Sequence, residues 1–553
     1  TFRTKPPSRK NQIQSELLED ETIEQEWESY KDRFYHLADY FNDSDSYQLQ
    51  SPEMDGKTVP NNQNEVSALF LERAFTIARD DAYVSQVLPG AIFSGLNCKD
   101  IRMHLLNNTE IKFLCHFVNN GIFQNIPNKY QFGVTVFKNS GTTEELSGIF
   151  MQDSTEVLDD LTKKAVKIPR QVLSEYSPKA RIFPQLRSQQ EVEVLNTIFE
   201  HDPIAETEHD WWVNPYTELH KTKDSERYIE SEEDADYPVL GGKNIFQFQY
   251  DPTLGNGVVS PELFSVEEDR DPETSAKRRI KERKVRSLKR GIYDAFDGSG
   301  SQKSFVNELL NEHRGKPLSP DDVLLDCTDY RIVIRNIARS TDERTLIASV
   351  IPPNVVCHHA INTVQKYRVN PSKEDLSETP LHSVYESIFT DEEMYACVGL
   401  LNSIPFDFLM RTKVDSNIVM YKLEESQMPH LSPGDEWFDY ISTRAARLNC
   451  YGEAFEEIRY HAKTYKAPLL AGQREKCVAA PPWPHIAVKA CIRLRGTLKP
   501  RHLRSGSSGV ARPARLPRRC YRAKPCANRQ PRRPRRASAG RSCARRDPPA
   551  RQR

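Results

Sequence analysis

The stretch YRIVIRNIARSTDERTLIASVIPP, residues Tyr330 to Pro353, decides the fold of the region around it. Its two ends are rich in apolar and β-branched residues, among them Ile332, Ile334 and Val350, whereas the middle segment, Arg339 to Glu343, is polar. This pattern predicts two short strands joined by a turn.

Four arginines and no lysine stand in this stretch. The guanidinium group presents a planar fork of donors that matches phosphate oxygens or the O6/N7 edge of guanine. We therefore expect these side chains to contact DNA. The alternative, which composition alone favours, is that they pair with neighbouring carboxylates. The four residues are Arg331, Arg335, Arg339 and Arg344.

Charge divides the chain into two unlike parts. Residues 1–470 carry 53 Lys and Arg against 76 Asp and Glu, a net charge of −23, whereas residues 471–553 carry 24 against 2, a net charge of +22. The second part is rich in Arg, Pro and Ala and has no helical or strand periodicity. It is expected to be a disordered basic tail or a segment read out of frame.

An acidic body can bind DNA only where basic residues gather, because phosphate contacts need local positive charge. The strongest cluster is AKRRIKERKVRSLKR, Ala276 to Arg290, which holds nine basic residues and one acid, Glu282. With Ser275 as a candidate cap, it predicts a basic helix that lies on the DNA backbone, although a solvated helix face is the alternative. The expected backbone contacts are Lys277, Arg278, Arg279, Lys281, Arg283 and Lys284.

Helices and strands alternate in the first part of the chain, which is typical of an α/β layer. Helices are expected near 23–38, 65–78 and 100–106, and strands near 83–90, 111–117 and 132–138. Further along, the pattern predicts a helix over Asp391 to Arg411 and a strand over Asn417 to Leu423. In that region Arg411 and Lys413 are expected to meet phosphate.

Other classes of protein fit this chain poorly. No apolar run is long enough to cross a membrane and no signal opens the chain, so we expect no membrane association and a cytoplasmic location. The six cysteines before residue 471 are too scattered for a disulfide framework. Cys357, His358 and His359 are adjacent and cannot converge on one tetrahedral ion, so no metal site is expected.

Residues 330–364, YRIVIRNIARSTDERTLIASVIPPNVVCHHAINTV, resemble the recurring R-x-I-A-R-x-T-x-x-R-T-x-I-A-x-x-I-P stretch of type IIG restriction-modification methylases. These are gamma-class N6-adenine DNA methyltransferases with a C-terminal target-recognition domain. LFLERAFTIARDDAYVSQVLPGAIF and GIFQNIPNKYQFGVTVFK are similar to the second half of their catalytic domain. PVLGGKNIFQFQY, Pro238 to Tyr250, resembles a segment that opens the recognition domain, but Gly241 replaces the family's acidic residue.

The resemblance implies a fold and a division into domains. Residues 1–185 would form the C-terminal half of a Rossmann-like α/β methyltransferase domain, and residues 186–470 a mixed α/β target-recognition domain, followed by the tail at 471–553. It also implies that the complete enzyme transfers a methyl group from S-adenosylmethionine to adenine N6 in double-stranded DNA. The setting would be restriction-modification or phage defence, where other restriction or defence subunits are candidate partners.

Adenine methylation needs a base-binding Asn/Asp-Pro-Pro-aromatic motif and a Gly-rich turn for the methyl donor. Neither Lys5-Pro6-Pro7-Ser8 nor Ile351-Pro352-Pro353-Asn354 fits, since neither offers an acceptor first or an aromatic ring last. We therefore expect an N-terminally truncated fragment that holds no catalytic residue and is inactive alone. S-adenosylmethionine would bind mainly in a region that is missing. The alternatives are a non-catalytic DNA specificity module that partners a separate methylase and, less favoured, an RNA methylase.

Overall fold

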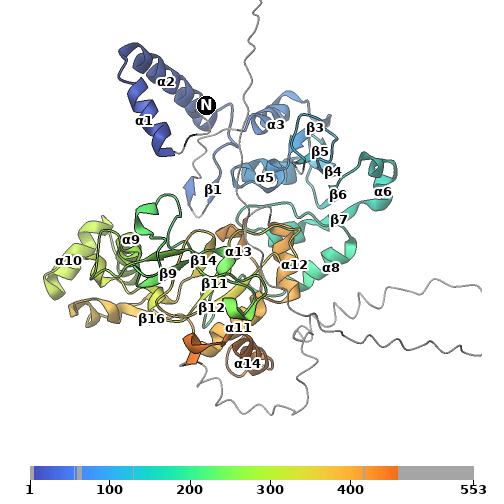
Figure 1. Ribbon diagram of the computed structural model, residues 1–553. Helices are drawn as coiled ribbons and strands as arrows, with labels where there is room; N and C mark the ends of the chain where they lie inside the picture. The colour runs from blue at the N-terminus through green and yellow to red at the C-terminus, as the bar shows by residue number, and fades with distance from the viewer. Residues whose placement is uncertain are drawn as a thin grey trace, which may run out of the picture. The chain divides into compact units, whose positions relative to one another are not determined.

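A computed structural model describes residues 5, 7–54, 56–58, 65–128, 130–414, 417–456 and 458. Over these residues the chain is a mixed α/β protein with several sheets, as the sequence predicts (Figure 1). No described helix is long and apolar enough to cross a membrane. The predictions for residues 471–553 lie outside the described residues.

The chain opens with two helices, α1 (Pro7–Leu17) and α2 (Glu21–Asp43). The predicted helix over 23–38 is confirmed and is longer at both ends. Asp20 caps α2, because its carboxylate accepts hydrogen bonds from the backbone N–H groups of Thr22 and Ile23. A small hairpin, β1 (Glu53–Met54) and β2 (Lys57–Thr58), follows.

A five-stranded sheet forms the first α/β layer, and it confirms the strands predicted there. The strands are β3 (Tyr83–Pro89), β4 (Glu110–Val118), β5 (Gln131–Lys138), β6 (Glu145–Gln152) and β7 (Val166–Pro169), in the order β3-β5-β4-β6-β7. The strand β5 runs antiparallel to both of its neighbours, β3 and β4, whereas the middle strand β4 runs parallel to β6. The helices α3 (Val66–Ile77), α4 (Ala91–Ser94) and α5 (Lys99–Asn108) lie beside these strands (Figure 1).

One face of this sheet is well covered, and the other is bare near β3. Leu71 and Phe75 of α3 and Leu105 of α5 belong to one hydrophobic cluster with Leu88 of β3. On the opposite face, the side chains of Tyr83 and Val87 remain 68% and 58% exposed. Among the described residues β3 has a hydrogen-bonded neighbour only on the β5 side. The layer therefore ends in an open, apolar edge.

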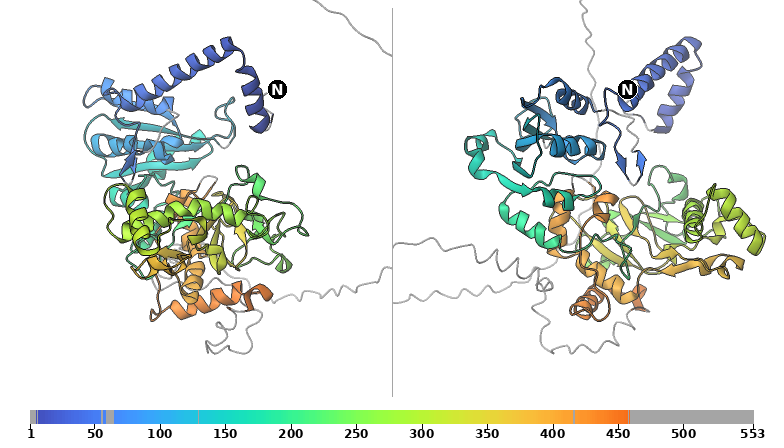
Figure 2. Two further views of the ribbon diagram at one scale, coloured as in Figure 1. Left: turned by 90° about the vertical axis from the view of Figure 1, so that its left-hand side faces the viewer. Right: turned by 180° about the vertical axis from the view of Figure 1, so that it is seen from behind.

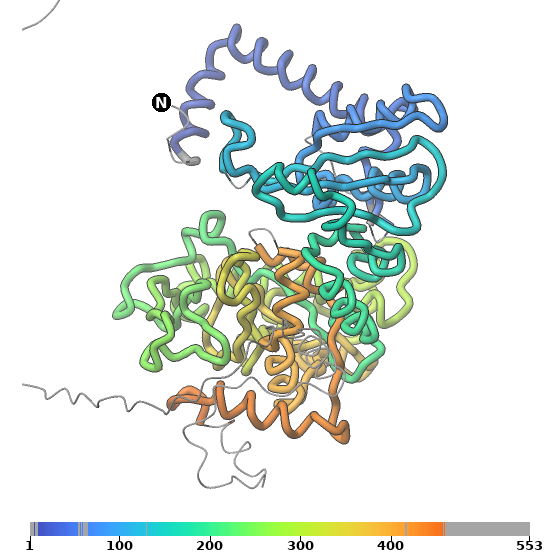
Figure 3. Tube along the Cα trace, turned by 90° about the vertical axis from the view of Figure 1, so that its right-hand side faces the viewer, coloured from blue at the N-terminus to red at the C-terminus, as the bar shows by residue number. Residues whose placement is uncertain are grey.

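Three short helices lead out of the layer: α6 (Leu161–Lys164), α7 (Arg170–Tyr176) and α8 (Gln189–Ile198). The segment around α7 contacts residues far along the chain. The hydroxyl of Ser177 donates to Glu425 Oε1 at 2.8 Å, and Pro203 pairs with Gln427 in an isolated bridge. The teal and orange segments accordingly lie side by side in Figure 3. The domain boundary at 185 stays a prediction.

The stretch Tyr330 to Pro353 forms two antiparallel strands, as predicted. These are β11 (Arg331–Arg335) and β12 (Ala348–Ile351), with Arg331 opposite Ile351 and Ile334 opposite Ala348. They belong to a four-stranded sheet in the order β12-β11-β14-β8, completed by β14 (Ile361–Val364) and β8 (Pro215–Tyr216). Smaller sheets are formed by β9 (Tyr237–Leu240), β10 (Leu263–Ser265) and β13 (Val356–Cys357), and by β15 (Tyr367–Val369) with β16 (Tyr385–Ser387).

The predicted basic helix is confirmed as α9 (Ala276–Ala295), and it packs beside α10 (Gln302–Arg314) (Figure 2). The hydroxyl of Ser275 accepts the N–H of Arg278 and caps α9. A narrow apolar stripe that includes Leu288 and Ile292 is buried in a cluster with Val306 and Leu310 of α10. The helix is thus fixed to the protein along one side.

The C-terminal helices differ from the prediction in two places. The single helix expected over Asp391 to Arg411 is two, α11 (Asp391–Leu401) and α12 (Ile404–Lys413), because Ser403 caps a new helix by accepting the Phe406 N–H. The strand expected over Asn417 to Leu423 is wrong, since α13 (Met420–Glu424) is helical there and only Asn417 makes an isolated bridge. The helix α14 (Phe438–Asn449) follows and packs on α11.

Candidate functional site

Arg331 lies in the core and corrects a prediction. Its side chain is fully buried, and its Nη2 donates to Glu218 Oε1 at 3.1 Å and to the carbonyl oxygen of Val355 at 2.7 Å. Burial by itself would lower the pKa of Arg331, but the charge of Glu218 raises that pKa above its usual value. Arg331 therefore holds the sheet together and cannot reach DNA without opening the core.

Lys413 is a second correction. Its ammonium group is buried beside Glu425, with Nζ 3.9 Å from Glu425 Oε1 and 3.1 Å from the hydroxyl oxygen of Ser426. Burial lowers the pKa of Lys413 to about 8, and Glu425 partly offsets this effect. The predicted phosphate contact from this side chain is not supported, because the ammonium has no exposed surface.

Arg344 and Arg411 organise the turn between β11 and β12. Arg411 donates to the carbonyl oxygens of Ser340, Asp342 and Glu343 at 2.8 to 3.0 Å, and to Asp407 Oδ2 at 3.0 Å. Arg344 donates to the carbonyl oxygen of Asn402 at 3.2 Å and lies 3.8 Å from Asp407 Oδ2. Both guanidinium groups are thus engaged within the protein and only partly exposed.

Arg339 stands at the exposed tip of the same turn. Its backbone N–H donates to Asp342 Oδ2 at 2.9 Å, whereas its side chain makes no ion pair within the part of the chain that the structure describes. Of the four predicted arginines, it has the most solvent-accessible setting. Its predicted contact with DNA stays a prediction.

The predicted basic contacts on α9 each face a carboxylate. Acidic residues from the surrounding loops lie within 3.2 Å of all six side chains, so the helix is bound electrostatically to its own protein. The positive charge of this helix is therefore largely paired with carboxylates of the same protein, an arrangement that differs from the solvated helix face considered as the alternative. The pairs are Lys277–Glu267, Arg278–Asp321, Arg279–Asp224, Lys281–Glu268, Arg283–Asp224 and Lys284–Asp326.

A cleft beside Arg335 has the opposite character. It encloses about 540 Å³ and is lined by basic residues, histidines and glycines, with Glu262 as its acid. We call it the basic cleft. The residues that define it are Lys221, Gly241, Lys243, Arg335, His358 and His359.

Three strand ends build the basic cleft. Arg335 closes β11, the turn at Gly241 follows β9, and His358 follows β13. The turn is fixed by Asn244, whose side chain accepts the Gly241 N–H at 2.6 Å and donates to the Val259 carbonyl oxygen at 2.9 Å. A Cβ at Gly241 would lie 2.4 Å from His358 Nε2. A side chain at position 241 would therefore collide with His358.

Among the described residues Arg335 makes no ion pair, although the charge of Asp342 acts on it and opposes the effect of burial on its pKa. Its Nη2 donates to the carbonyl oxygen of Ile245 and its guanidinium lies 6.0 Å from the centroid of the Phe246 ring. Its Nε is buried and makes no hydrogen bond among the described residues. Burial lowers the pKa of Arg335. Because Arg335 also lines the cleft, its guanidinium group is a candidate ligand for an anion there.

The two histidines are neutral donors. Burial, then the nearby His359 and Lys221, lower the pKa of His358 to about 4, and burial likewise lowers the pKa of His359. His358 Nδ1 accepts the Ala360 N–H and His359 Nδ1 accepts the Lys221 N–H, each at 3.2 Å. In a neutral imidazole whose Nδ1 accepts, the proton resides on Nε2. Each ring therefore keeps one N–H donor.

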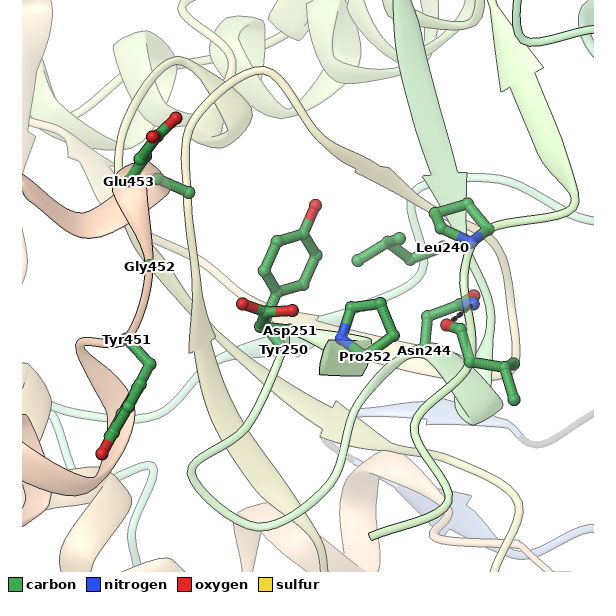
Figure 4. A pocket seen from close by; sticks show the side chains of 11 residues that line it. Leu240, Asn244, Tyr250, Asp251, Pro252, Tyr451, Gly452 and Glu453 are labelled. Carbon is green, nitrogen blue, oxygen red and sulfur yellow. Dashed lines mark hydrogen bonds between the residues drawn. The ribbon is translucent and has the colours of Figure 1, made fainter. Parts of the chain in front are cut away.

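Two other clefts are acidic by comparison. The smaller one encloses about 180 Å³ (Figure 4), where Tyr250 lies between Tyr451 and Glu453 on one side and Asn244 on the other. The larger one encloses about 410 Å³, and there His209 Nε2 lies 3.1 Å from Asp202 Oδ2. Carboxylates in both clefts disfavour a polyanion.

Three glycines of the first α/β layer are closely packed. The strand-to-helix turn after β3 contains Gly90, but a Cβ there would lie 2.8 Å from the side chain of Gln131. Gly133 likewise packs against Phe93, and Gly148 against the backbone of Leu114. None of these three glycines therefore forms an open turn of the kind that a methyl donor needs.

Comparison with known proteins adds three distant likenesses. No family model and no curated relative matches the chain. The type IIL enzyme MmeI in complex with DNA is 11% identical, covering 80% of this chain and 51% of its own, with a TM-score of 0.34. The type ISP enzyme LlaBIII bound to DNA is 9% identical, covering 75% of this chain and 28% of its own, with a TM-score of 0.36. The type IIG restriction endonuclease BpuSI is 13% identical, covering 75% of this chain and 47% of its own, with a TM-score of 0.26.

This chain thus spans about half or less of the length of each of these enzymes. At TM-scores below 0.5 the likenesses do not define its fold or its function. The site residues that the sequence interpretation missed are Lys221, Lys243 and the two histidines. The sequence signal that could have indicated this part of the cleft is the Gly-Gly-Lys run at 241–243, which forms the turn after β9.

Proposed function

We propose that this chain is the DNA-recognising part of an adenine-specific DNA methyltransferase in a restriction-modification or phage-defence system. The complete enzyme would transfer a methyl group from S-adenosylmethionine to adenine N6 in double-stranded DNA. Further restriction or defence subunits are candidate partners. The chain itself would supply duplex binding and site choice, and would support part of the pocket that receives the target base.

The observation that carries this proposal is the place of the R-x-I-A-R-x-T-x-x-R-T-x-I-A-x-x-I-P stretch in the fold. Its first arginine, Arg335, lines the basic cleft at the end of β11. Its third, Arg344, and the following Thr345 are both tied to Asp407, which lies on a different element. The motif thus forms a hairpin whose turn is held by Asp407 and whose Arg335 lines the basic cleft. A guanidinium group at a cleft suits the binding of a polyanion.

The open edge at β3 supports the catalytic half of the proposal. Edge strands that expose apolar side chains are an association hazard unless another element covers them. Tyr83 and Val87 are such side chains, and Phe70 of α3 is 68% exposed. Since this layer resembles the second half of a methylase catalytic domain, we infer that the remaining strands extend the sheet from β3. Donor binding and methyl transfer belong to that remaining part.

A non-catalytic specificity module is the second candidate. It is favoured by the packing of Gly90, Gly133 and Gly148, none of which forms an open turn for a methyl donor. The two candidates differ in where the donor site is encoded. In the first it is part of the same polypeptide, and in the second it is part of a separate methylase.

Methyl transfer and duplex binding test the proposal together. The natural full-length protein, incubated with labelled S-adenosylmethionine and duplex DNA, is expected to place the label on adenine N6 at one sequence. The present chain alone is expected to bind the same duplex and to transfer nothing. Label on cytosine or on RNA, or a chain that binds no duplex, would contradict the proposal. Activity that appears only after a separate methylase is added would select the specificity module.

A further inference from the structure

We propose that the basic cleft is a binding site for a single backbone phosphate of DNA, with Lys221, Lys243 and Arg335 as its ligands. The inference rests on the proposed function and deepens it, because it assigns the cleft to backbone contact and not to base reading. Backbone contacts fix the register of a protein on the duplex without reading sequence.

The first argument is charge balance. On α9 each predicted basic contact faces a carboxylate within 3.2 Å, and buried Arg331 is paired with Glu218. Exposed Lys221 and Lys243 make no such pair with any of the described residues. With Arg335 they give the cleft three positive charges against one, on Glu262. In an acidic protein such an unbalanced cluster attracts an anion.

The second argument is the donor set. The buried Nε of Arg335 has no acceptor among the described residues, while its Nη2 is fixed on the Ile245 carbonyl oxygen. The guanidinium is therefore oriented before any ligand arrives. His358 and His359 each keep an Nε2–H group, because their Nδ1 atoms accept backbone hydrogens. Phosphate offers only acceptors at neutral pH, so it matches a site lined by donors.

The third argument is access. Gly241 and Gly242 line the cleft where a side chain would crowd it, since a Cβ at Gly242 would lie 3.3 Å from the Ala360 carbonyl oxygen and 3.4 Å from Arg335 Cγ. Glycines let a ligand approach the backbone closely. The positive side chains of this site can only donate, which suits phosphate oxygens and also the O6/N7 edge of guanine. A phosphate is the better match because it also carries the negative charge that three positive side chains attract.

The test compares the full chain with three variants that share its basic tail. Lys221→Gln and Lys243→Gln remove exposed charges without disturbing the core, and Arg335→Lys keeps the charge but loses the fork. Lys163→Gln is the matched control, because Lys163 is 81% exposed on α6 and does not line the cleft. Duplex affinity is measured between about 0.1 and about 0.5 M salt, on several duplex sequences.

Each lysine variant is expected to reduce the slope of log K against log salt by about 0.9, which corresponds to about eightfold weaker binding at 0.1 M salt. The reduction should be equal for every duplex sequence and absent in Lys163→Gln. Arg335→Lys should weaken binding in the same uniform way. Cleft variants that behave like the control overturn the phosphate site while leaving the proposed function standing. Failure of the unaltered chain to bind duplex overturns the proposed function itself.

Two other outcomes also overturn the inference. A loss confined to one base pair of the duplex would assign the cleft to base reading. The melting temperature in inorganic phosphate, compared with chloride at equal ionic strength, tests for a free anion. One such outcome is a melting temperature that rises in phosphate for the unaltered chain but not for Lys243→Gln, while Lys243→Gln keeps the duplex affinity and salt slope of the unaltered chain. This outcome would assign the cleft to free phosphate.

Discussion

Arg331 donates through Nη2 to Glu218 Oε1 at 3.1 Å, and neither side chain is more than 1% exposed. Glu218 also accepts the backbone N–H of Cys357 at 2.6 Å, so one carboxylate joins β11 to β13. An arginine that the sequence predicts to contact DNA therefore stabilises the interior of the protein.

Removing one partner of this pair should destabilise the fold. Arg331→Ala would leave the Glu218 carboxylate buried without its counter-charge, and we expect a loss of about 3 to 5 kcal/mol in the free energy of unfolding. Urea unfolding measures this loss. Arg339→Ala, at the exposed turn, is the control and should change stability by less than about 0.5 kcal/mol. Normal stability of Arg331→Ala combined with lost duplex binding would contradict the structural role.

Asp407 should be the anchor of the β11–β12 turn. Its Oδ1 accepts the N–H groups of Thr345 and Leu346 at 2.8 and 2.9 Å, while its Oδ2 accepts from Arg411. We expect Asp407→Ala to lower the free energy of unfolding by about 3 kcal/mol, because hydrogen bonds to a charged group are each worth about 1.5 to 3 kcal/mol and do not add fully.

Thermal or urea unfolding of Asp407→Ala can be compared with Asp342→Asn. Asp342 accepts only the Arg339 N–H on the exposed turn, so its substitution should cost less than about 1 kcal/mol. Equal losses in the two variants would show that the turn does not depend on the buried carboxylate.

The strands of this region could be predicted because Ile332, Ile334 and Val350 mark buried sheet positions whatever their partners are. The helix α9 could be predicted for a similar reason, since its cap and apolar stripe are local. The strand expected over Asn417 to Leu423 failed because a short apolar run fits a helix as well, and the contacts that decide lie elsewhere. Ile418 donates its N–H to the Asn336 carbonyl oxygen across the fold.

The site could be predicted only in part. Arg335 belongs to both the predicted set and the basic cleft, whereas Lys221 and Lys243 were not singled out. Local sequence shows how many charges a segment carries but not which carboxylates meet them after folding. Asp224, which pairs with Arg279 and Arg283, is more than fifty residues away from both along the chain. Charge left unmatched is thus a property of the tertiary structure.

Stability should depend on pH through Lys413. Its pKa is lowered to about 8 in the folded protein, against about 10.4 in an unfolded chain, so between these values the unfolded state binds more protons. The free energy of unfolding therefore gains a favourable contribution as pH rises from about 8 to about 10.4. Below pH 8 that contribution is absent, because the buried ammonium stays charged.

Lys413→Met should remove this contribution. We expect the difference in unfolding free energy between the unaltered chain and Lys413→Met to shift in favour of the unaltered chain as pH rises through that window. Unfolding in urea at several pH values measures the difference. The comparison is needed because Glu425, whose pKa burial raises, and other buried groups also titrate. A difference that does not change with pH between 8 and 10 would contradict the assignment.

Gly241 should be intolerant of a side chain for a steric reason. Its Cβ would lie 2.4 Å from His358 Nε2, and we expect Gly241→Ala to cost about 1 to 3 kcal/mol of unfolding free energy by overpacking. Gly242→Ala, whose nearest contact would be 3.3 Å, should cost less. Adding His358→Ala to Gly241→Ala should recover part of the loss. A double-mutant cycle without coupling would exclude this contact as the cause.

Val87 should control association of the chain through the open edge of β3. The residue is 58% exposed on a strand that lacks a second neighbour among the described residues, and such an edge pairs readily with other chains. Val87→Lys places a charge on that edge, so we expect weaker concentration-dependent association with a change in stability within about 0.5 kcal/mol. Light scattering against protein concentration measures association.

Ser85→Lys, on the same face but replacing a polar side chain, controls for added charge and should have the smaller effect, since it removes no apolar surface. Unchanged association in Val87→Lys would mean that the edge is not the contact surface, and would remove one support for extension of the sheet from β3.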